Sequence, residues 1–433
     1  MYQYKYQPLT SQAREVRLLL IKKPTDKVEP ITLALQHASL DDEEPFNALS
    51  YSWGEENPTY RILICDGVTQ GRFRVRRNLY EFLQAARTST HDWSHERIWI
   101  DQICINQDDH TERCQQVSQM GDLYSTAQAT IVWPGSLHAH HNLAAKTPEY
   151  GFAGPIFSNQ EAQAMIFPSD TPHPNIHTPS EPAVCLLTSF SRHALVGLLS
   201  SPYWWRLWIV QEIVLASRVR VLLSDTVWEF KDLHSVFKIF YNHKDHSEIV
   251  KCKGLDAKLN DILRRTTSLT LMRGYYSLSR RNIFPALHHT WSTIIAYVRA
   301  THCTISLDRI YGVMALLAED LRVQPDYTIS TRDLLRRILA KEITFTARER
   351  PRGDFWRRLK ILLSCWGEFA GFEPVWRTGA LTQLNLRPEP GETHNFFEHD
   401  VRLTLQGLDI QIPGEIEAAL SALASESEAS HTT

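Results

Sequence analysis

The side chains of this sequence that could carry chemistry begin with acidic and amide groups at the end of a short apolar run. Arg97–Ile100 is typical of a buried strand, and Asp101, Asn106 and Gln107 follow it in one loop. In an open parallel sheet, ligands bind just beyond the carboxyl ends of the strands. Asp101 is therefore a candidate catalytic carboxylate, and Asn106 and Gln107 are candidate ligand-binding residues. The alternative is that these side chains only cap the turn and the helix that follows.

A second candidate carboxylate, Glu212, lies in a segment that the pattern predicts to be helical from Tyr203 to Ala216. Trp208, Glu212 and Leu215 are spaced i, i+4 and i+7, so the carboxylate is expected on an apolar stripe. A buried carboxylate must become neutral or find a donor. Arg113 and Arg206 are the candidate donors. Such a pair can serve function or architecture, and both interpretations remain open.

Aromatic residues concentrate around these polar groups. Most of the tryptophans are expected to be core residues. Trp53-Gly54 is different, because it follows the predicted strand Ala48–Ser52. A glycine at that position lets the backbone approach a ligand closely.

The motifs of several enzyme classes are absent. The sequence has no Gly-x-Gly-x-x-Gly, Walker loop, His-Glu-x-x-His or Gly-x-Ser-x-Gly, which argues against a Rossmann dehydrogenase, a P-loop ATPase, a zincin and an α/β-hydrolase. Five histidines between His138 and His177 have no cysteine or carboxylate partner at a familiar ligand spacing, so no metal site is expected. The basic run Arg348–Lys360 is diluted by acidic residues and is interpreted as a solvated helix face.

Composition excludes further classes of protein. The chain has 433 residues and a formal charge of −3, which argues against a dedicated nucleic-acid binder. No uncharged apolar stretch of about 18 residues occurs, so no membrane span is expected. The N-terminus lacks the apolar run of a secretory signal. Seven scattered cysteines form no Cys-x-x-Cys pair and are interpreted as reduced thiols. We therefore expect a cytoplasmic protein.

Strand and helix signals alternate in the first part of the chain and predict an α/β fold with a central, largely parallel sheet flanked by helices. Asn78 is the predicted N-cap of a helix over Leu79–Ala86, and another helix is predicted from Asp109. The predicted strands are Arg17–Ile21, Ile31–Leu35, Ala48–Ser52, Arg61–Cys65, Arg97–Ile100, Thr130–Trp133 and Arg218–Leu223.

We predict a three-part organisation. Residues 1–240 form the α/β domain, interrupted by a Pro-rich flexible insertion at 136–190. Residues 241–415 form a mainly helical region, in which Leu307 to Leu317 mark one face and Thr331 caps a later helix. An alternating pattern near Val401 predicts a late strand, and residues 416–433 are expected to be a disordered tail.

Three blocks of the sequence resemble the fungal heterokaryon incompatibility (HET) domain, in the order of that family. The resemblance covers about residues 45–330, including a downstream segment at Ser306–Gly312 and Pro325–Tyr327; Pro134 departs from the usual apolar residue before Gly135. The blocks are Phe46–Gly54; Ile98–Gln107 with Glu112, Arg113, Gln116, Met120, Tyr124, Ala127 and the strand to Gly135; and Tyr203–Glu212.

The resemblance implies a role in fungal non-self recognition, in which the domain triggers growth arrest and programmed cell death after unlike hyphae fuse. It also implies a distant, TIR- or flavodoxin-like character of the sheet. Some TIR domains cleave NAD, but a shared fold is weak evidence for shared chemistry.

One hypothesis is a TIR-like glycohydrolase that takes NAD or a related nucleotide as substrate and needs no further cofactor. Cleavage of the nicotinamide–ribose bond passes through an oxocarbenium-like state, which Glu212 or Asp101 would stabilise. Arg113 or Arg206 would hold the phosphates. Tyr51 or Trp53, next to Gly54, would stack on the base.

The other hypothesis is a non-enzymatic signalling module that self-associates or binds an incompatibility partner protein. The same polar residues would then be internal scaffolding. A regulatory protein that kept the fold but lost toxicity is a third interpretation. The sequence does not decide among them.

Overall fold

The computed structural model describes residues 2–10, 14–24, 29–54, 57–136, 197–223, 226–242, 255–280, 290–298 and 300–349, with short pieces between 355 and 418. The predicted insertion at 136–190 lies, apart from its first residue, outside the described residues, and so does nearly all of the predicted tail at 416–433. The chain divides into two compact units, Met1–Ile283 and Phe284–Thr433.

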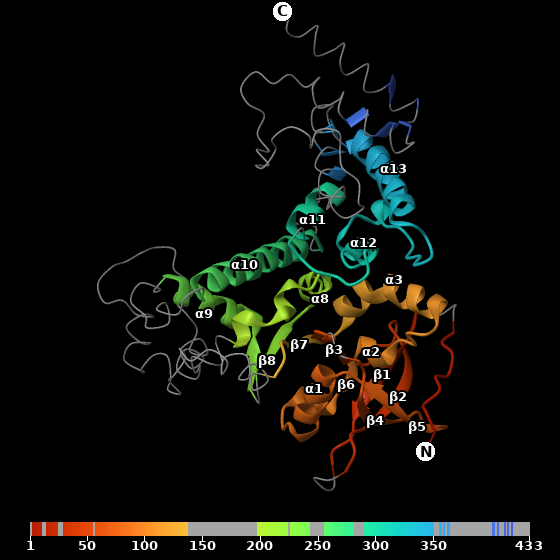
Figure 1. The fold of residues 1–433 in the computed structure, drawn as a ribbon, viewed down its shortest axis with the longest axis vertical. Helices are drawn as coiled ribbons and strands as arrows, with labels where there is room; N and C mark the ends of the chain where they lie inside the picture. Colours follow the sequence, from red (N-terminus) through yellow and green to blue (C-terminus); the bar gives the residue numbers. More distant parts are fainter. Residues whose placement is uncertain are drawn as a thin grey trace, which may run out of the picture. The chain divides into compact units, whose positions relative to one another are not determined.

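The first unit is built on a nine-stranded mixed sheet with the strand order β5-β4-β2-β1-β6-β3-β7-β8-β9 (Figure 1). Seven of the nine strands overlap a predicted strand. Six of these lie close to the predicted bounds, and β2 starts within the predicted Ile31–Leu35 strand and extends beyond it. The strands are β1 Glu15–Ile21, β2 Thr32–Ser39, β3 Phe46–Tyr51, β4 Tyr60–Cys65, β5 Gln70–Val75, β6 Arg97–Trp99, β7 Ala129–Trp133, β8 Val219–Leu223 and β9 Thr226–Glu229.

The sheet is parallel at its centre, where β6, β3, β7 and β8 are neighbours. It is antiparallel between β1 and β2, β1 and β6, β4 and β5, and β8 and β9. β2 and β4 form one further parallel pair outside this block, so the sheet is mixed and not largely parallel as expected. The reason is connection length, because links such as Asp66–Thr69 are too short for the crossover that parallel strands need.

Helices cover both faces of the central strands, and α1 (Arg77–Thr88) and α3 (His110–Thr126) lie on opposite sides of them in Figure 1. Phe82 of α1 packs against Trp133 at a ring separation of 5.9 Å. Tyr124 of α3 packs against Trp99 at 5.8 Å. The central parallel strands are therefore buried on both faces, as expected for this kind of sheet.

Asn78 is not the N-cap of α1. The cap position is Arg76, and no side chain caps it. The Asn78 amide instead donates to the carbonyl of Ser52 at 2.7 Å and accepts a hydrogen bond from Trp133 Nε1 at 2.8 Å. Its polar side chain therefore ties α1 to the ends of β3 and β7.

The predicted continuous helix from Tyr203 to Ala216 is broken in two. A 3₁₀ turn, η2, covers Pro202–Trp205, and α8 covers only Ile209–Val214. Ser201 and Pro202 start the turn in the manner of a helix N-terminus. Arg206 then adopts an extended backbone, with φ −66° and ψ 138°. In the turn before this break, the buried rings of Tyr203 and Trp204 pack against each other at 5.2 Å.

The first unit continues through α9 (Phe230–Asn242) and α10 (Leu255–Arg280). In the second unit the described helices include α11 (Trp291–Val298), α12 (Asp308–Tyr311) and α13 (Thr331–Glu349). No described helix combines the length and the apolar character needed to cross a bilayer.

Three details of this region correct the sequence predictions. The stretch from Leu307 to Leu317 is not one helix, because α12 ends at Tyr311 and a 3₁₀ turn follows at Met314–Leu316. Ser330, rather than Thr331, caps α13 by accepting a hydrogen bond from the Asp333 backbone at 3.1 Å. Val401 and the residue after it are helical, so the late strand is wrong.

Candidate functional site

Asp101 lies where the predicted strand end places it. It is the first residue of α2 (Asp101–Cys104), and a single residue separates it from the end of β6. One carboxylate oxygen accepts from the Gln102 backbone N–H at 2.7 Å, and the other from Trp53 Nε1 at 2.7 Å. Asp101 therefore fixes the helix start, as the capping interpretation expects, and also holds an aromatic ring at the end of β3.

Glu212 is 2% exposed and lies on α8, over the middle of β3. Its carboxylate accepts a short hydrogen bond from Ser50 Oγ, and Ser50 Oγ in turn lies 2.7 Å from the hydroxyl of Tyr203. Thr130 of the neighbouring strand donates to the Glu212 backbone carbonyl at 3.2 Å. Strand β3 therefore holds the Glu212 side chain, with Tyr203 of the turn behind Ser50, and β7 holds the Glu212 backbone.

Arg206 is the cation that acts on both candidate carboxylates. Its Nη1 is 3.8 Å from Glu212 Oε2, and its positive charge acts on both Asp101 and Glu212. The side chain is 19% exposed, and the buried Nη1 has no hydrogen-bond partner within the described structure. The charge of Asp101 also acts on Glu212. The two acidic residues, remote in sequence, are thus both influenced by the charge of one guanidinium, and Asp101, Arg206 and Glu212 are called the acidic cluster below.

Burial dominates the electrostatics of the acidic cluster. Loss of hydration raises the pKa of Glu212 to about 7, although Arg206 and the Ser50 hydroxyl favour the ionised form. Burial also raises the pKa of Asp101, against the opposing effects of Arg206 and Trp53. The cluster can therefore hold a proton at neutral pH, which is the property required of a general acid or base.

This pKa predicts how stability depends on pH. A glutamate with a folded-state pKa near 7 and an ordinary unfolded-state pKa near 4.5 keeps its proton longer in the folded state, so stability falls as pH rises through that window. The loss reaches about 3 kcal/mol at most. Urea unfolding of the full chain at pH 5 and pH 7.5 measures it. In the Glu212→Gln variant the loss should shrink, and an unchanged pH dependence would contradict the pKa.

Arg113, the other candidate partner of Glu212, plays a different part. It lies on α3 and contacts His110 Nδ1 at 3.3 Å, whereas the cation paired with Glu212 is Arg206. Asn106 gives its backbone N–H to Glu112 at 2.7 Å, and Gln107 donates to the Asp101 carbonyl at 2.9 Å. In this structure Asn106 and Gln107 therefore shape the loop that carries Asp101.

The aromatic end of β3 is divided between buried and partly exposed groups. Tyr51 is 1% exposed, so in this structure its ring face is buried and is not free to stack on a base. Its hydroxyl donates to Gln102 Oε1 at 3.3 Å. Trp53 is partly exposed, and the guanidinium of Arg76 lies 5.3 Å from its ring centre. Gly54 has φ +78°, and a Cβ at this position would meet no heavy atom within 4 Å. Glycine is therefore favoured here by the backbone conformation and not by close approach.

Three residues of this region were not predicted from the sequence. Ser50 and Tyr203 form the hydrogen-bonded chain to Glu212, and Arg76 covers Trp53 and donates to the Gly54 carbonyl at 2.5 Å. A serine inside a fully buried strand was the available signal for Ser50. The other two contacts depend on tertiary structure alone.

A buried ion pair between Arg17 and Glu112 stabilises the loop that follows Asp101. Arg17 is 0% exposed, and its guanidinium binds both oxygens of Glu112, at 2.6 and 3.0 Å. It also donates to the carbonyls of Cys104 at 3.0 Å and Gln7 at 2.7 Å. This one side chain therefore joins β1, α3, the N-terminal segment and the end of α2.

The segment that contains the acidic cluster is similar to known proteins. Residues 46–212 match the model of the family described as heterokaryon incompatibility protein (HET), a span that includes the whole cluster. A curated relative, "Heterokaryon incompatibility protein 6, OR allele" of Neurospora crassa, is 24% identical over 380 residues, which are 80% of this chain and 53% of that protein. The chain thus spans about half the length of that relative. No solved structure matches the chain significantly.

Proposed function

Because residues 46–212 of this chain match the model of the heterokaryon incompatibility (HET) family, we propose that the protein acts in fungal non-self recognition and triggers programmed cell death after unlike hyphae fuse. The name of the Neurospora relative supports this proposal at the level of incompatibility. The trigger would be an incompatibility partner protein or self-association, and the place of action would be the cytoplasm, where fused hyphae mix their contents.

For the chemistry, we propose hydrolysis of the nicotinamide–ribose bond of NAD or a related nucleotide, as the TIR-like resemblance suggests. The observation that carries the proposal is that the charge of Arg206 acts on both Asp101 and Glu212, with the pKa of Glu212 raised to about 7. In such a reaction the electron pair of the glycosidic bond leaves with nicotinamide and neutralises its ring nitrogen. Water then adds to the ribose C1′, and a carboxylate takes the proton of that water.

In this proposal the two carboxylates have different roles. Asp101 is the less buried of the two and faces the partly exposed Trp53, so it is the group to stabilise the positive charge of the oxocarbenium-like state. Glu212, buried behind Arg206, is the group to hold or release a proton. Arg206 already balances these two charges. The phosphates would therefore need another cation, for which Arg76 at Trp53 is the candidate.

The test is nicotinamide release from NAD by the purified full-length chain. Single Glu212→Gln and Asp101→Asn variants should each lose at least about a hundredfold in rate, since the first removes the group that takes the proton and the second removes charge stabilisation from the transition state. Glu81→Gln is the matched control, because Glu81 is an acidic residue of α1 paired with Arg77 outside the cluster. If the double variant keeps the wild-type rate, the chemical proposal is wrong.

A second candidate function is a non-enzymatic signalling module. The observation in its favour is that Glu212 is 2% exposed and bonded entirely within the protein, so the cluster could be scaffolding. Cell killing would then fall only in proportion to the amount of folded protein. A Glu212→Gln variant that melts like the wild type but no longer kills would exclude this function.

A further inference from the structure

The second half of β2 has a sheet neighbour on one side only. β4 pairs with β2 over Thr32, Leu33 and Ala34 and then ends at Cys65. β2 continues to Ser39, paired with β1 along its whole length. Within the described part of the chain, residues 35–39 therefore form an exposed edge inside a nine-stranded sheet.

The pairing with β1 fixes which backbone groups point outward. Leu40 N–H bonds to the carbonyl of Arg14 and Lys22 N–H bonds to the carbonyl of Thr32, so the even-numbered residues of β2 are those bonded to β1. The odd-numbered residues direct their N–H and C=O groups away from β1. Ser39 N–H is taken by Asp42 Oδ2 at 2.9 Å. The N–H and C=O of His37 are left facing the open side of the strand.

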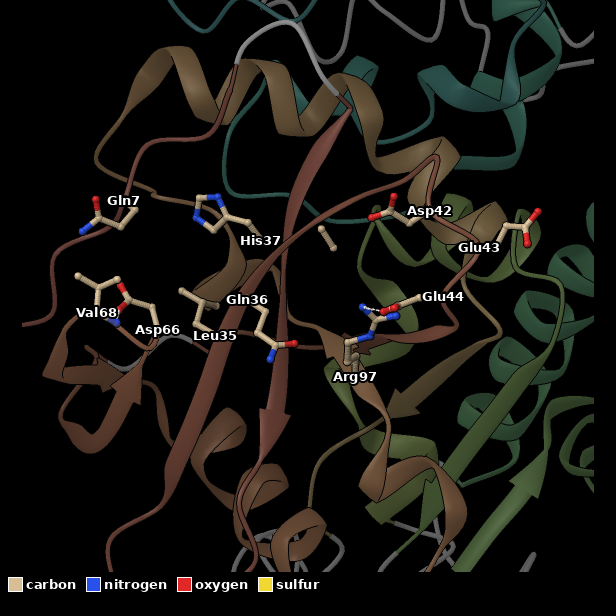
Figure 2. Close-up of a pocket in the computed structure, with 11 residues that line it drawn as sticks. Gln7, Leu35, Gln36, His37, Asp42, Glu43, Glu44, Asp66, Val68 and Arg97 are labelled. Atoms are coloured by element: carbon tan, nitrogen blue, oxygen red, sulfur yellow. Dashed lines mark hydrogen bonds and ion pairs between the residues drawn. The ribbon is translucent and has the colours of Figure 1, made fainter.

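A hollow of about 860 Å³ surrounds this edge. Figure 2 shows Gln36 and His37 between Asp66 and Val68 on one side and the loop Asp42–Glu44 on the other. The full lining is Gln7, Leu35, Gln36, His37, Ala38, Asp42, Glu43, Glu44, Asp66, Val68 and Arg97.

The charge of the hollow is negative. Four carboxylates line it, at Asp66 and in the loop Asp42–Glu44, and all of that loop is exposed. Arg97 is its one arginine and is paired with Glu44 at 2.5 Å. His37 lies 2.8 Å from Glu15, which adds a further acid beside it. A ligand of this hollow would therefore carry positive charge.

We propose that the hollow binds an extended, basic segment of another protein, which pairs with the His37 backbone as an added strand. Backbone hydrogen bonds would supply affinity, and lysine or arginine side chains facing the acidic rim would supply specificity. The occupant is not a second copy of the same edge, because two acidic rims would then face each other. This binding site is separate from the acidic cluster and does not depend on its chemistry.

The test uses a fluorescent peptide of alternating lysine and valine, with a glutamate–valine peptide as control, and fluorescence anisotropy with the full-length chain. We expect saturable binding of the basic peptide alone. His37→Pro should weaken it about tenfold or more, since proline removes the outward N–H but no bond to β1. His37→Ala keeps the N–H and should bind within about threefold of the wild type.

The paired variants separate strand addition from attraction of charge alone. Equal binding by wild type and His37→Pro, with both folded by circular dichroism, overturns the proposal, and so does the absence of saturable binding at low salt. Hydrogen exchange gives an independent measurement, because the His37 amide of the wild type should become protected when the peptide is added. Glu43→Lys should weaken binding and reduce its salt dependence.

Discussion

Replacement of Arg17 by alanine is expected to lower the free energy of unfolding by about 3–5 kcal/mol, the range for breaking a buried ion pair from one side. Arg17 is 0% exposed and Glu112 is 7% exposed, so the glutamate charge would be left in a site that water barely reaches. The carbonyls of Gln7 and Cys104 would lose their donor as well. Urea unfolding of the full chain, followed by tryptophan fluorescence, measures the change.

The matched control is Arg14→Ala on the same segment. Arg14 pairs with Asp41 and Asp122 at 2.7 and 2.8 Å, but it is 42% exposed, so water screens its charge and the loss should stay below about 1 kcal/mol. A further variant, Arg17→Met with Glu112→Leu, should recover part of the stability, because apolar pairs often replace buried ion pairs well. If the two arginine variants lose equal stability, burial is not the cause.

Replacement of Arg206 by methionine is also expected to lower the free energy of unfolding by about 3–5 kcal/mol at pH 7.5. The negative charge of Asp101 would then act on Glu212 without the opposing charge of Arg206, so the pKa of Glu212 should rise further above 7. The loss should be smaller at pH 5, where protonation removes the carboxylate charge without help from Arg206. Urea unfolding of the wild type and the variant at pH 7.5 and at pH 5 measures the loss of stability at each pH.

A second substitution distinguishes charge from packing at this position. Adding Glu212→Gln to Arg206→Met should restore most of the stability at pH 7.5, because one of the two repelling charges is gone. A loss that is equal at both pH values, and that Glu212→Gln does not relieve, would mean that the aliphatic part of Arg206 matters and its charge does not. In that case the proton-holding role of the acidic cluster would have no support.

Local sequence was sufficient for those parts of the fold that depend on local pattern. Aliphatic runs predicted the buried strands β1, β3, β4, β7 and β8, and the position of Asp101 after β6 followed from the same reasoning. β5 and β9 were not predicted. β5 carries two arginines and a glycine, and it is a strand because a short turn returns it to β4.

The candidate site shows where such reasoning fails. Asn78 has the chemistry of a cap, but Trp133 and Ser52 recruit its side chain. The segment after Pro202 has helical periodicity, yet Tyr203 and Trp204 are buried in a 3₁₀ turn, where Tyr203 bonds to Ser50 and Trp204 to the Leu198 carbonyl. The choice of Arg206 over Arg113 as the partner of Glu212 depended on that interruption, because the extended backbone of Arg206 is not a feature that side-chain spacing reports.

The contact between Ser50 and Glu212 joins residues 162 positions apart. During translation, at about 5–20 residues per second, Ser50 is made roughly 8–30 seconds before Glu212. A nascent or prematurely released chain that stops before Arg206 carries Asp101 without either of its later companions. Incomplete products of the ribosome therefore lack the acidic cluster, and only a chain translated past Glu212 can form it.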